Sequence, residues 1–276
     1  MLPGYHTVGL LQHDLTTAIE ELAALGYRAV AVRPQRGQLA QADPWFGQQI
    51  LRLADVTAKH QLELVFDLDS SFIHDPWKNR GPALASSNPD EAKLARDWIE
   101  SWLKIAAEAK ACLVTFASGQ SDGSIGQDTE STLTCLAHEL DHLVSTAHEL
   151  EVTIALRPKH GDCISTVAQW ERLQQWLNAD VLGLAADIGE MLLGHEIPLA
   201  DRLDRNREAL ACVYLCDRRT DQAVDQPIGQ GDIAQDRLIS SLREINFEGP
   251  VVVRIEGHSQ QGLTLAEQGM QLFKTP

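Results

Sequence analysis

The chain has 276 residues, of which 44% are apolar, and its formal net charge is −16. This length, with no low-complexity linker, predicts one domain spanning residues 1–276, and the acidic excess argues against nucleic acid and anionic membrane surfaces as partners. Five scattered cysteines without a Cys-x-x-Cys pair, and a start without an apolar leader, predict a cytoplasmic protein with reduced thiols.

Short apolar runs alternate with longer amphipathic segments along the whole chain. Eight runs have the length and composition of strands: Tyr5–Leu11, Arg28–Val32, Leu62–Leu68, Ala111–Ala117, 152–157, 181–187, Ala211–Leu215 and Pro250–Ile255. Eight segments have helical periodicity: Asp14–Gly26, Pro44–His60, Asp90–Lys110, 131–150, 165–177, 198–209, 233–245 and Leu263–Phe273.

Strict alternation of strand and helix requires a parallel sheet, because each helix returns the chain to the same end of the next strand. Eight such units favour an α/β fold that closes into a (β/α)₈ TIM barrel. A doubly wound open sheet is the alternative, but no glycine-rich phosphate fingerprint follows the first predicted strand.

Period-two alternation then sorts the residues of the late strands by face. The residues expected to point into the barrel are Thr153, Ala155 and Arg157, then Gly183, Ala185 and Asp187, and finally Val252, Arg254 and Glu256. Small residues low in the barrel and large polar ones at the carboxyl ends are typical of an active-site mouth.

Five stretches in order resemble one family, the xylose isomerase-like barrels of sugar isomerases and epimerases. They are Phe72-Ile-His-Asp-Pro76, Thr115-Phe-Ala-Ser-Gly119, Gly183-Leu-Ala-Ala-Asp-Ile-Gly189, Tyr214-Leu-Cys-Asp217 and Ile228-Gly-Gln-Gly-Asp232. In the last, Gly229 and Gly231 are expected to shape a turn. The resemblance implies the barrel fold, a carbohydrate-like substrate at its mouth and, by analogy, assembly as a homo-oligomer.

Such relatives hold a divalent cation with Glu, Asp, His and Glu on strands five to eight. Here the corresponding residues are Arg157, Asp187, Tyr214 and Arg254, and Glu190 replaces a second histidine. A divalent cation about 5 Å from one guanidinium is repelled by roughly 6–7 kcal/mol at an effective dielectric of about 20. Arginine does not deprotonate to relieve this repulsion, so we expect neither a metal nor another cofactor.

Two interpretations of the arginines stay open. In one, Arg157 and Arg254 bind a phosphorylated or acidic sugar through their planar forks. In the other, they pair with Asp187, Glu190 and Glu256, and so fill a vacated metal site.

The remaining candidates are carboxylates, histidines and aromatic residues near strand ends. Asp187, Glu190 and Asp217 are the candidates for proton transfer, and the predicted substrate contacts are Arg157, Arg254, Asp67, His160, Tyr214, Glu256 and His258. His74 and His195 follow strands too, and Trp45, Trp77 and Trp98 are expected mainly to pack.

These residues support an isomerase or epimerase-like barrel that acts on, or binds, a carbohydrate-like molecule of anionic character without the metal of its relatives. The alternative is a catalytically inactive member that binds a metabolite or a partner protein. Kinship to the endonuclease IV branch is disfavoured, because that branch needs several metal-binding histidines.

Overall fold

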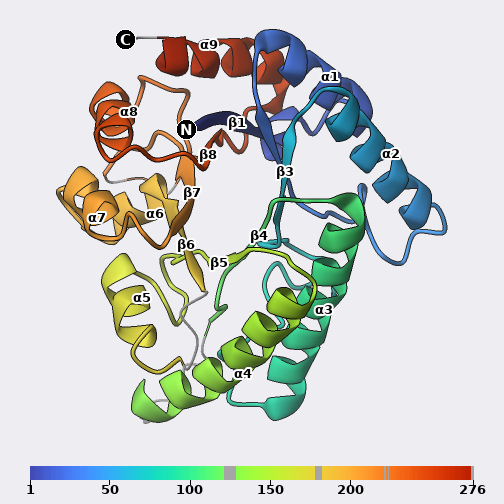
Figure 1. The fold of residues 1–276 in the computed structure, drawn as a ribbon, viewed down its shortest axis with the longest axis vertical. Coiled ribbons are helices and arrows are strands. Elements are labelled where there is room, and N and C mark those ends of the chain that lie inside the picture. Colours follow the sequence, from blue (N-terminus) through green and yellow to red (C-terminus); the bar gives the residue numbers. More distant parts are fainter. Residues whose placement is uncertain (121–128, 178–181, 221, 223, 275–276) are drawn as a thin grey trace.

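The computed structural model describes residues 1–120, 129–177, 182–220, 222 and 224–274. Eight parallel strands form a closed barrel in chain order, with the helices outside it (Figure 1). The strands are β1 (Leu2–His6), β2 (Ala29–Val32), β3 (Glu63–Asp67), β4 (Leu113–Phe116), β5 (Ile154–Leu156), β6 (Gly183–Asp187), β7 (Leu210–Leu215) and β8 (Pro250–Val253). The prediction of a single-domain (β/α)₈ barrel is confirmed.

Within the described ranges, one more helix surrounds the barrel than the sequence predicted. They are α1 (Leu15–Leu25), α2 (Phe46–Lys59), α3 (Pro89–Ala109), α4 (Thr129–Glu149), α5 (Val167–Leu173), α6 (Ile188–Leu193), α7 (Leu199–Arg205), α8 (Gln235–Glu244) and α9 (Gly262–Lys274), with 3₁₀ turns η1 (Thr7–Leu10) and η2 (Ser259–Gln261). Helix α9 packs beside α1, so the two ends of the chain close the outer layer together (Figure 1).

Most predicted bounds differ from the structure by a few residues, and two differences are larger. The first strand is Leu2–His6 and not Tyr5–Leu11, because Nδ1 of His6 accepts the Val8 N–H and starts the turn η1. The short helix α6 was not predicted; Asp187 ends β6 and also caps α6, accepting the N–H groups of Gly189 and Glu190. Residue 181, the predicted start of the sixth strand, lies outside the described residues.

Two separate apolar clusters stabilise the barrel. The larger one lies between strands and helices and includes Trp102, Phe66 and Leu140. The smaller one contains Ala31, Val65, Leu113, Ala155, Ala185, Cys212, Tyr214 and Val252, drawn from β2 to β8. Because these residues alternate with members of the larger cluster along each strand, they fill the barrel interior. The predicted inward positions of Ala155, Ala185 and Val252 are thereby confirmed.

The register places polar residues beside one another near the carboxyl ends of neighbouring strands. Asp67 of β3 lies opposite Thr115 of β4, and Asp187 of β6 lies opposite Tyr214 of β7.

Among the described residues, no helix combines the length and apolar character needed to cross a membrane.

Candidate functional site

The carboxyl ends of the strands bring the two arginines and Asp187 together at the barrel axis. Arg157 directly follows β5, Arg254 directly follows β8, and Asp187 is the last residue of β6. Their exposed fractions are 1%, 3% and 1%, so all three are buried. Charged groups this deeply buried are stable only when paired.

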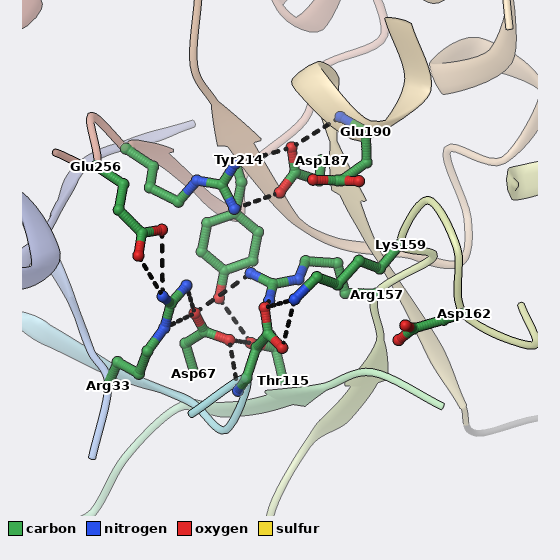
Figure 2. A network of polar contacts seen from close by, with 12 residues as sticks. Arg33, Asp67, Thr115, Arg157, Lys159, Asp162, Asp187, Glu190, Tyr214 and Glu256 are labelled. Carbon is green, nitrogen blue, oxygen red and sulfur yellow. Dashed lines mark hydrogen bonds and ion pairs between the residues drawn. The ribbon is translucent and has the colours of Figure 1, made fainter. Parts of the chain in front are cut away.

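Donors from three residues converge on one carboxylate oxygen of Asp67 (Figure 2). Its Oδ2 accepts from Nη2 of Arg33 at 2.8 Å and from Nη1 of Arg157 at 3.2 Å, and it lies 2.9 Å from Nε2 of His6. Since Nδ1 of His6 already accepts a backbone N–H, its proton lies on Nε2 and is donated to Asp67. Burial lowers the pKa of His6 to about 4, so this histidine is neutral at pH 7.

Asp69 extends the same network toward the rim of the barrel. It accepts from Nη2 of Arg157 and from Nζ of Lys159, whose distance to Oδ1 is 2.8 Å. On the other side, Arg33 reaches Glu256, with Nη1 3.3 Å from Oε2. Arg33, Arg157 and Lys159 thus face Asp67, Asp69 and Glu256, and their charges cancel.

A second group of ion pairs contains Arg254. Its Nη1 lies 2.7 Å from Oδ2 of Asp187, and its Nε lies 3.6 Å from Oδ2 of Asp225. Arg218 continues this chain, donating to Glu190 at 3.0 Å and to Asp225 at 2.8 Å. The prediction that arginine pairs with Asp187 is confirmed for Arg254, whereas Arg157 pairs with Asp67 and Asp69, and Glu190 and Glu256 pair with other arginines.

The pairing decides the charge states of the buried carboxylates. Burial alone would raise the pKa of Asp67, but Arg157 and Arg33 hold it well below its usual range. Burial likewise opposes ionisation of Asp187, while Arg254 and Arg157 lower its pKa. Asp69 follows the same pattern, since Arg157 and Lys159 outweigh burial and lower its pKa. These aspartates are therefore ionised at pH 7 and are poor proton acceptors.

Tyr214 fills the space between the two groups (Figure 2). Its hydroxyl shares a hydrogen bond of 2.6 Å with Thr115, and its ring lies under the guanidinium of Arg157, 5.1 Å from centroid to Cζ. Burial raises its pKa well above the usual value, so the phenol is neutral. Tyr214 thus packs against Arg157 with its hydroxyl already bonded to Thr115.

The residues present do not fit the divalent cation that the resemblance implies. Of the four corresponding positions only Asp187 offers an anionic ligand, and Arg254 and two backbone N–H groups already bind its carboxylate. Across the part of the chain that the structure describes, no three His, Cys, Asp or Glu side chains are arranged to hold a metal. Guanidinium groups stand where ligands would be needed.

The other predicted site residues lie around this network in different roles. Asp217 binds the backbone N–H groups of Gly229, Gly231 and Ile233 at 2.8–3.3 Å. A Cβ on Gly231 would lie 2.2 Å from Asp217, so Asp217 and the two glycines shape the predicted turn. The carboxylate of Asp217 is thereby used for structure.

The predicted histidines are spread over the mouth. His160 is exposed and uses its backbone N–H to bind Glu190, whereas Nε2 of His258 lies 3.1 Å from the carbonyl oxygen of Asp225. His195 is exposed after α6, and the ring of His74 meets Trp98 edge to face at 5.1 Å.

The aromatic residues divide into exposed and partly buried ones. Trp45 and Trp77 are 63% and 90% exposed, so the expectation that they pack was wrong for these two. Trp98 is partly buried on α3 and agrees with that expectation.

Sequence reasoning missed five charged residues of the network: Arg33, Asp69, Lys159, Arg218 and Asp225. Arg33 directly follows β2, and this position after a strand was the signal that could have found it. Arg218 and Asp225 lie in the loop after β7. They are seven residues apart, and no sequence pattern in a loop predicts an ion pair at that separation. Lys159 was passed over in favour of its neighbour His160.

A cavity of about 540 Å³ lies beside the axis rather than on it. It is bounded by the loop after β3, by α3, by the end of β4 and by the loop after β5. Asp69 and Lys159 separate it from the ion pairs around Asp67. At the mouth of the barrel, the axis is therefore filled by side chains, and the open space lies next to it.

The comparisons with known proteins agree with this fold. The family model for the xylose isomerase-like TIM barrel matches residues 19–275. The chain belongs to this family. A search by sequence against curated proteins finds no significant relative.

Several solved structures that are similar to this chain are sugar epimerases. A D-psicose 3-epimerase with D-tagatose from Clostridium cellulolyticum H10 matches with a TM-score of 0.77 and 16% identity, over 99% of this chain and 97% of that one. The apo 3-keto-D-glucoside 4-epimerase from E. coli gives 0.78 and 15% over all of both chains. A Methylomonas sp. D-allulose 3-epimerase in complex with D-allulose gives 0.76 and 15%, over 99% and 96%. At these identities the likeness shows the fold alone.

Proposed function

We propose that this protein binds a carbohydrate-like small molecule at the carboxyl ends of its strands, without a divalent metal at the barrel axis and without the metal-assisted chemistry of such barrels. The observation that carries the proposal is the contact of 2.7 Å between Arg254 and Asp187. It uses the one carboxylate left at the metal-ligand positions, and Arg157 occupies a second of those positions.

The buried network also favours binding over catalysis at the axis. Each predicted proton-transfer group is bonded within the protein: Asp187 to Arg254, Glu190 to Arg218, and Asp217 to backbone N–H groups. An anionic sugar that used Arg157 would have to displace Asp67 and Asp69 from it. Breaking such a buried pair costs about 3–5 kcal/mol, and this cost argues against the arginines as phosphate or carboxylate contacts.

A carbohydrate-like ligand is supported by family membership and by the epimerases of similar structure, two of which are described with D-tagatose or D-allulose. The alternative, a protein that serves only a partner protein, predicts no sugar binding at all. Sugar binding therefore separates the two.

Elemental analysis tests the metal part. Protein purified with Mn²⁺, Mg²⁺ and Co²⁺ supplied should carry well under one equivalent of divalent metal, whereas the double variant Arg157→Glu with Arg254→Glu should gain affinity for it. Stoichiometric metal in the unaltered protein contradicts the proposal.

Ligand-observed NMR with D-tagatose and D-allulose, in excess chelator, tests the binding part. Saturable binding without conversion of the sugar supports the proposal. Epimerisation of either sugar, or the absence of binding to these and other keto sugars, contradicts it.

A further inference from the structure

The cavity beside the axis has two kinds of wall. Trp98 and Ile99 of α3, with Phe116 at the end of β4, form an apolar wall. Polar groups from the loops after β3 and β5 form the other, among them Ser70 and Asp162. A concave space of a few hundred Å³ with an apolar face and a few convergent polar groups is typical of a small-molecule site.

Asp162 is held in this wall by the chain around it. Its Oδ2 accepts the Gly119 N–H at 3.2 Å, and its Oδ1 lies 3.4 Å from Arg80. Only 5% of its side chain is exposed. Figure 2 shows Asp162 beyond Lys159, with none of the drawn contacts reaching it. Asp162 is therefore buried with weaker pairing than the aspartates at the axis.

The burial of Asp162 is costly to the folded protein. It raises the pKa of this carboxyl to about 6, against the opposing effect of Lys159 and Arg80 and with a smaller contribution from Asp69. A buried carboxyl that is poorly compensated and lines a cavity is typical of a functional site.

Ser70 is a second polar residue of the cavity wall, and its side chain lacks a hydrogen-bond partner among the described residues. Its hydroxyl is buried. Buried polar atoms are normally bonded, so an unpaired one that lines a cavity points to a ligand or water.

The charges of the lining decide which class of ligand fits. Lys159 is bound to Asp69, and Arg80 is near Asp162, so neither described cation of the wall is left for an anion. Burial lowers the pKa of His74, which is therefore neutral at pH 7. Glu91 adds a negative charge. The cavity suits an uncharged molecule with several hydroxyl groups.

We propose that this cavity is the ligand site, and that it binds an uncharged polyhydroxylated ring with one face against Trp98 and its hydroxyls on Asp162 and Ser70. The inference rests on the proposed function and gives it a location. The sequence suggested an anionic ligand bound to Arg157 and Arg254, whereas the ligand proposed here is neutral and lies beside these arginines. Ring faces of sugars stack on aromatic side chains in this way.

Titration of the sugar against variants tests the location, with D-allulose and D-tagatose as probes and NMR or calorimetry as readout. Asp162→Asn removes the charge at constant shape and should weaken binding roughly tenfold or more. Trp98→Ala should weaken it by roughly three- to tenfold, and Trp98→Phe should restore part of the loss. The matched controls are Trp176→Ala and Asp204→Asn, both outside the cavity, which should bind as the unaltered protein does.

Circular dichroism and a thermal melt confirm that each variant is folded, so that a loss of binding is a loss of contact. Binding that survives in folded Asp162→Asn and Trp98→Ala but is lost in Glu256→Gln places the ligand over the axis, and overturns the inference while the proposed function stands. Equal loss in the control variants also overturns it. If the unaltered protein binds none of the sugars, the proposed function itself fails.

Discussion

The barrel axis and the cavity beside it differ in how their buried charges are balanced. At the axis, Asp67 and Asp187 each face arginine at 2.7–3.2 Å, and their pKa values are lowered. In the cavity wall, Asp162 has one arginine at 3.4 Å, and its pKa is raised to about 6. The first region is charge-compensated and closed, whereas the second is under-compensated and open. On our proposal, the charge-compensated residues at the axis stabilise structure, and the ligand binds where a buried carboxyl is under-compensated.

The largest expected effect is at the centre of the compensated region. Asp67→Asn leaves Arg33 and Arg157 without their shared carboxylate, and should lower the free energy of unfolding by about 3–5 kcal/mol. Urea denaturation at pH 7 measures this, with the exposed Asp204→Asn as the control that should change little. Equal effects of the two substitutions would mean that burial of the pairs contributes nothing.

Asp162 should behave in the opposite way and depend on pH. Its raised pKa means that the folded protein holds a proton more tightly than the unfolded chain, so its contribution to stability falls as pH rises from about 4 to about 6. The Asp162→Asn variant has no titrating carboxyl at this position, so it does not lose this stability as pH rises. The variant should gain stability relative to the unaltered protein between these pH values, by at most about 3 kcal/mol.

Urea denaturation at pH 4, 5, 6 and 7 measures that gain. Arg80, Lys159 and Asp69 also face Asp162, so the comparison is made between two proteins that share them. At the axis the sign is reversed: lowered pKa values give stability that is lost as pH falls below about 4. A stability difference that is constant over this range would show that Asp162 is not the titrating group.

A smaller effect should come from the backbone that holds Asp162. Gly119 has a φ of 74°, and a Cβ there would lie 2.5 Å from the Cβ of Ala83. Gly119→Ala should cost about 1–3 kcal/mol and weaken sugar binding, because its N–H binds Asp162. Gly37→Ala, where a Cβ meets nothing within 4 Å, is the control. A stable Gly119→Ala protein with unchanged binding would remove this residue from the account.

The smallest effect is expected at the rim of the axis network. Glu256 is 54% exposed and pairs with Arg33 at 3.3 Å. Glu256→Gln should change the free energy of unfolding by less than about 1 kcal/mol, because exposed ion pairs are screened by water. A thermal melt at low and high salt measures it. A loss as large as that of Asp67→Asn would show that the rim is as strongly coupled as the centre.

The sequence was enough to predict the barrel and three of the residues that meet at its axis. Alternating elements require parallel strands. Period-two alternation along β6, and continued one residue past β5 and β8, places Asp187, Arg157 and Arg254 inside. These inferences depend on local sequence patterns, which can be read from a single sequence.

The partners of those residues could not be predicted in the same way. Asp67 and Arg157 are 90 residues apart in the sequence, and only closure of the barrel brings them together. The sequence therefore suggested Glu190 and Glu256 as partners of the two arginines, whereas Arg157 pairs with Asp67 and Asp69. The cavity was missed because Ser70, Trp98 and Asp162 come from three separate elements. Asp162 has no strand pattern of its own, and its weak pairing is visible only in three dimensions.

One measurement tests the account most directly: a crystal structure of the protein grown with Mn²⁺ and D-allulose. The account predicts Arg254 on Asp187, Arg157 on Asp67, and sugar density against Trp98 and Asp162. A cation bound to Asp187, with Arg254 turned away and the sugar above it on the barrel axis, would contradict it.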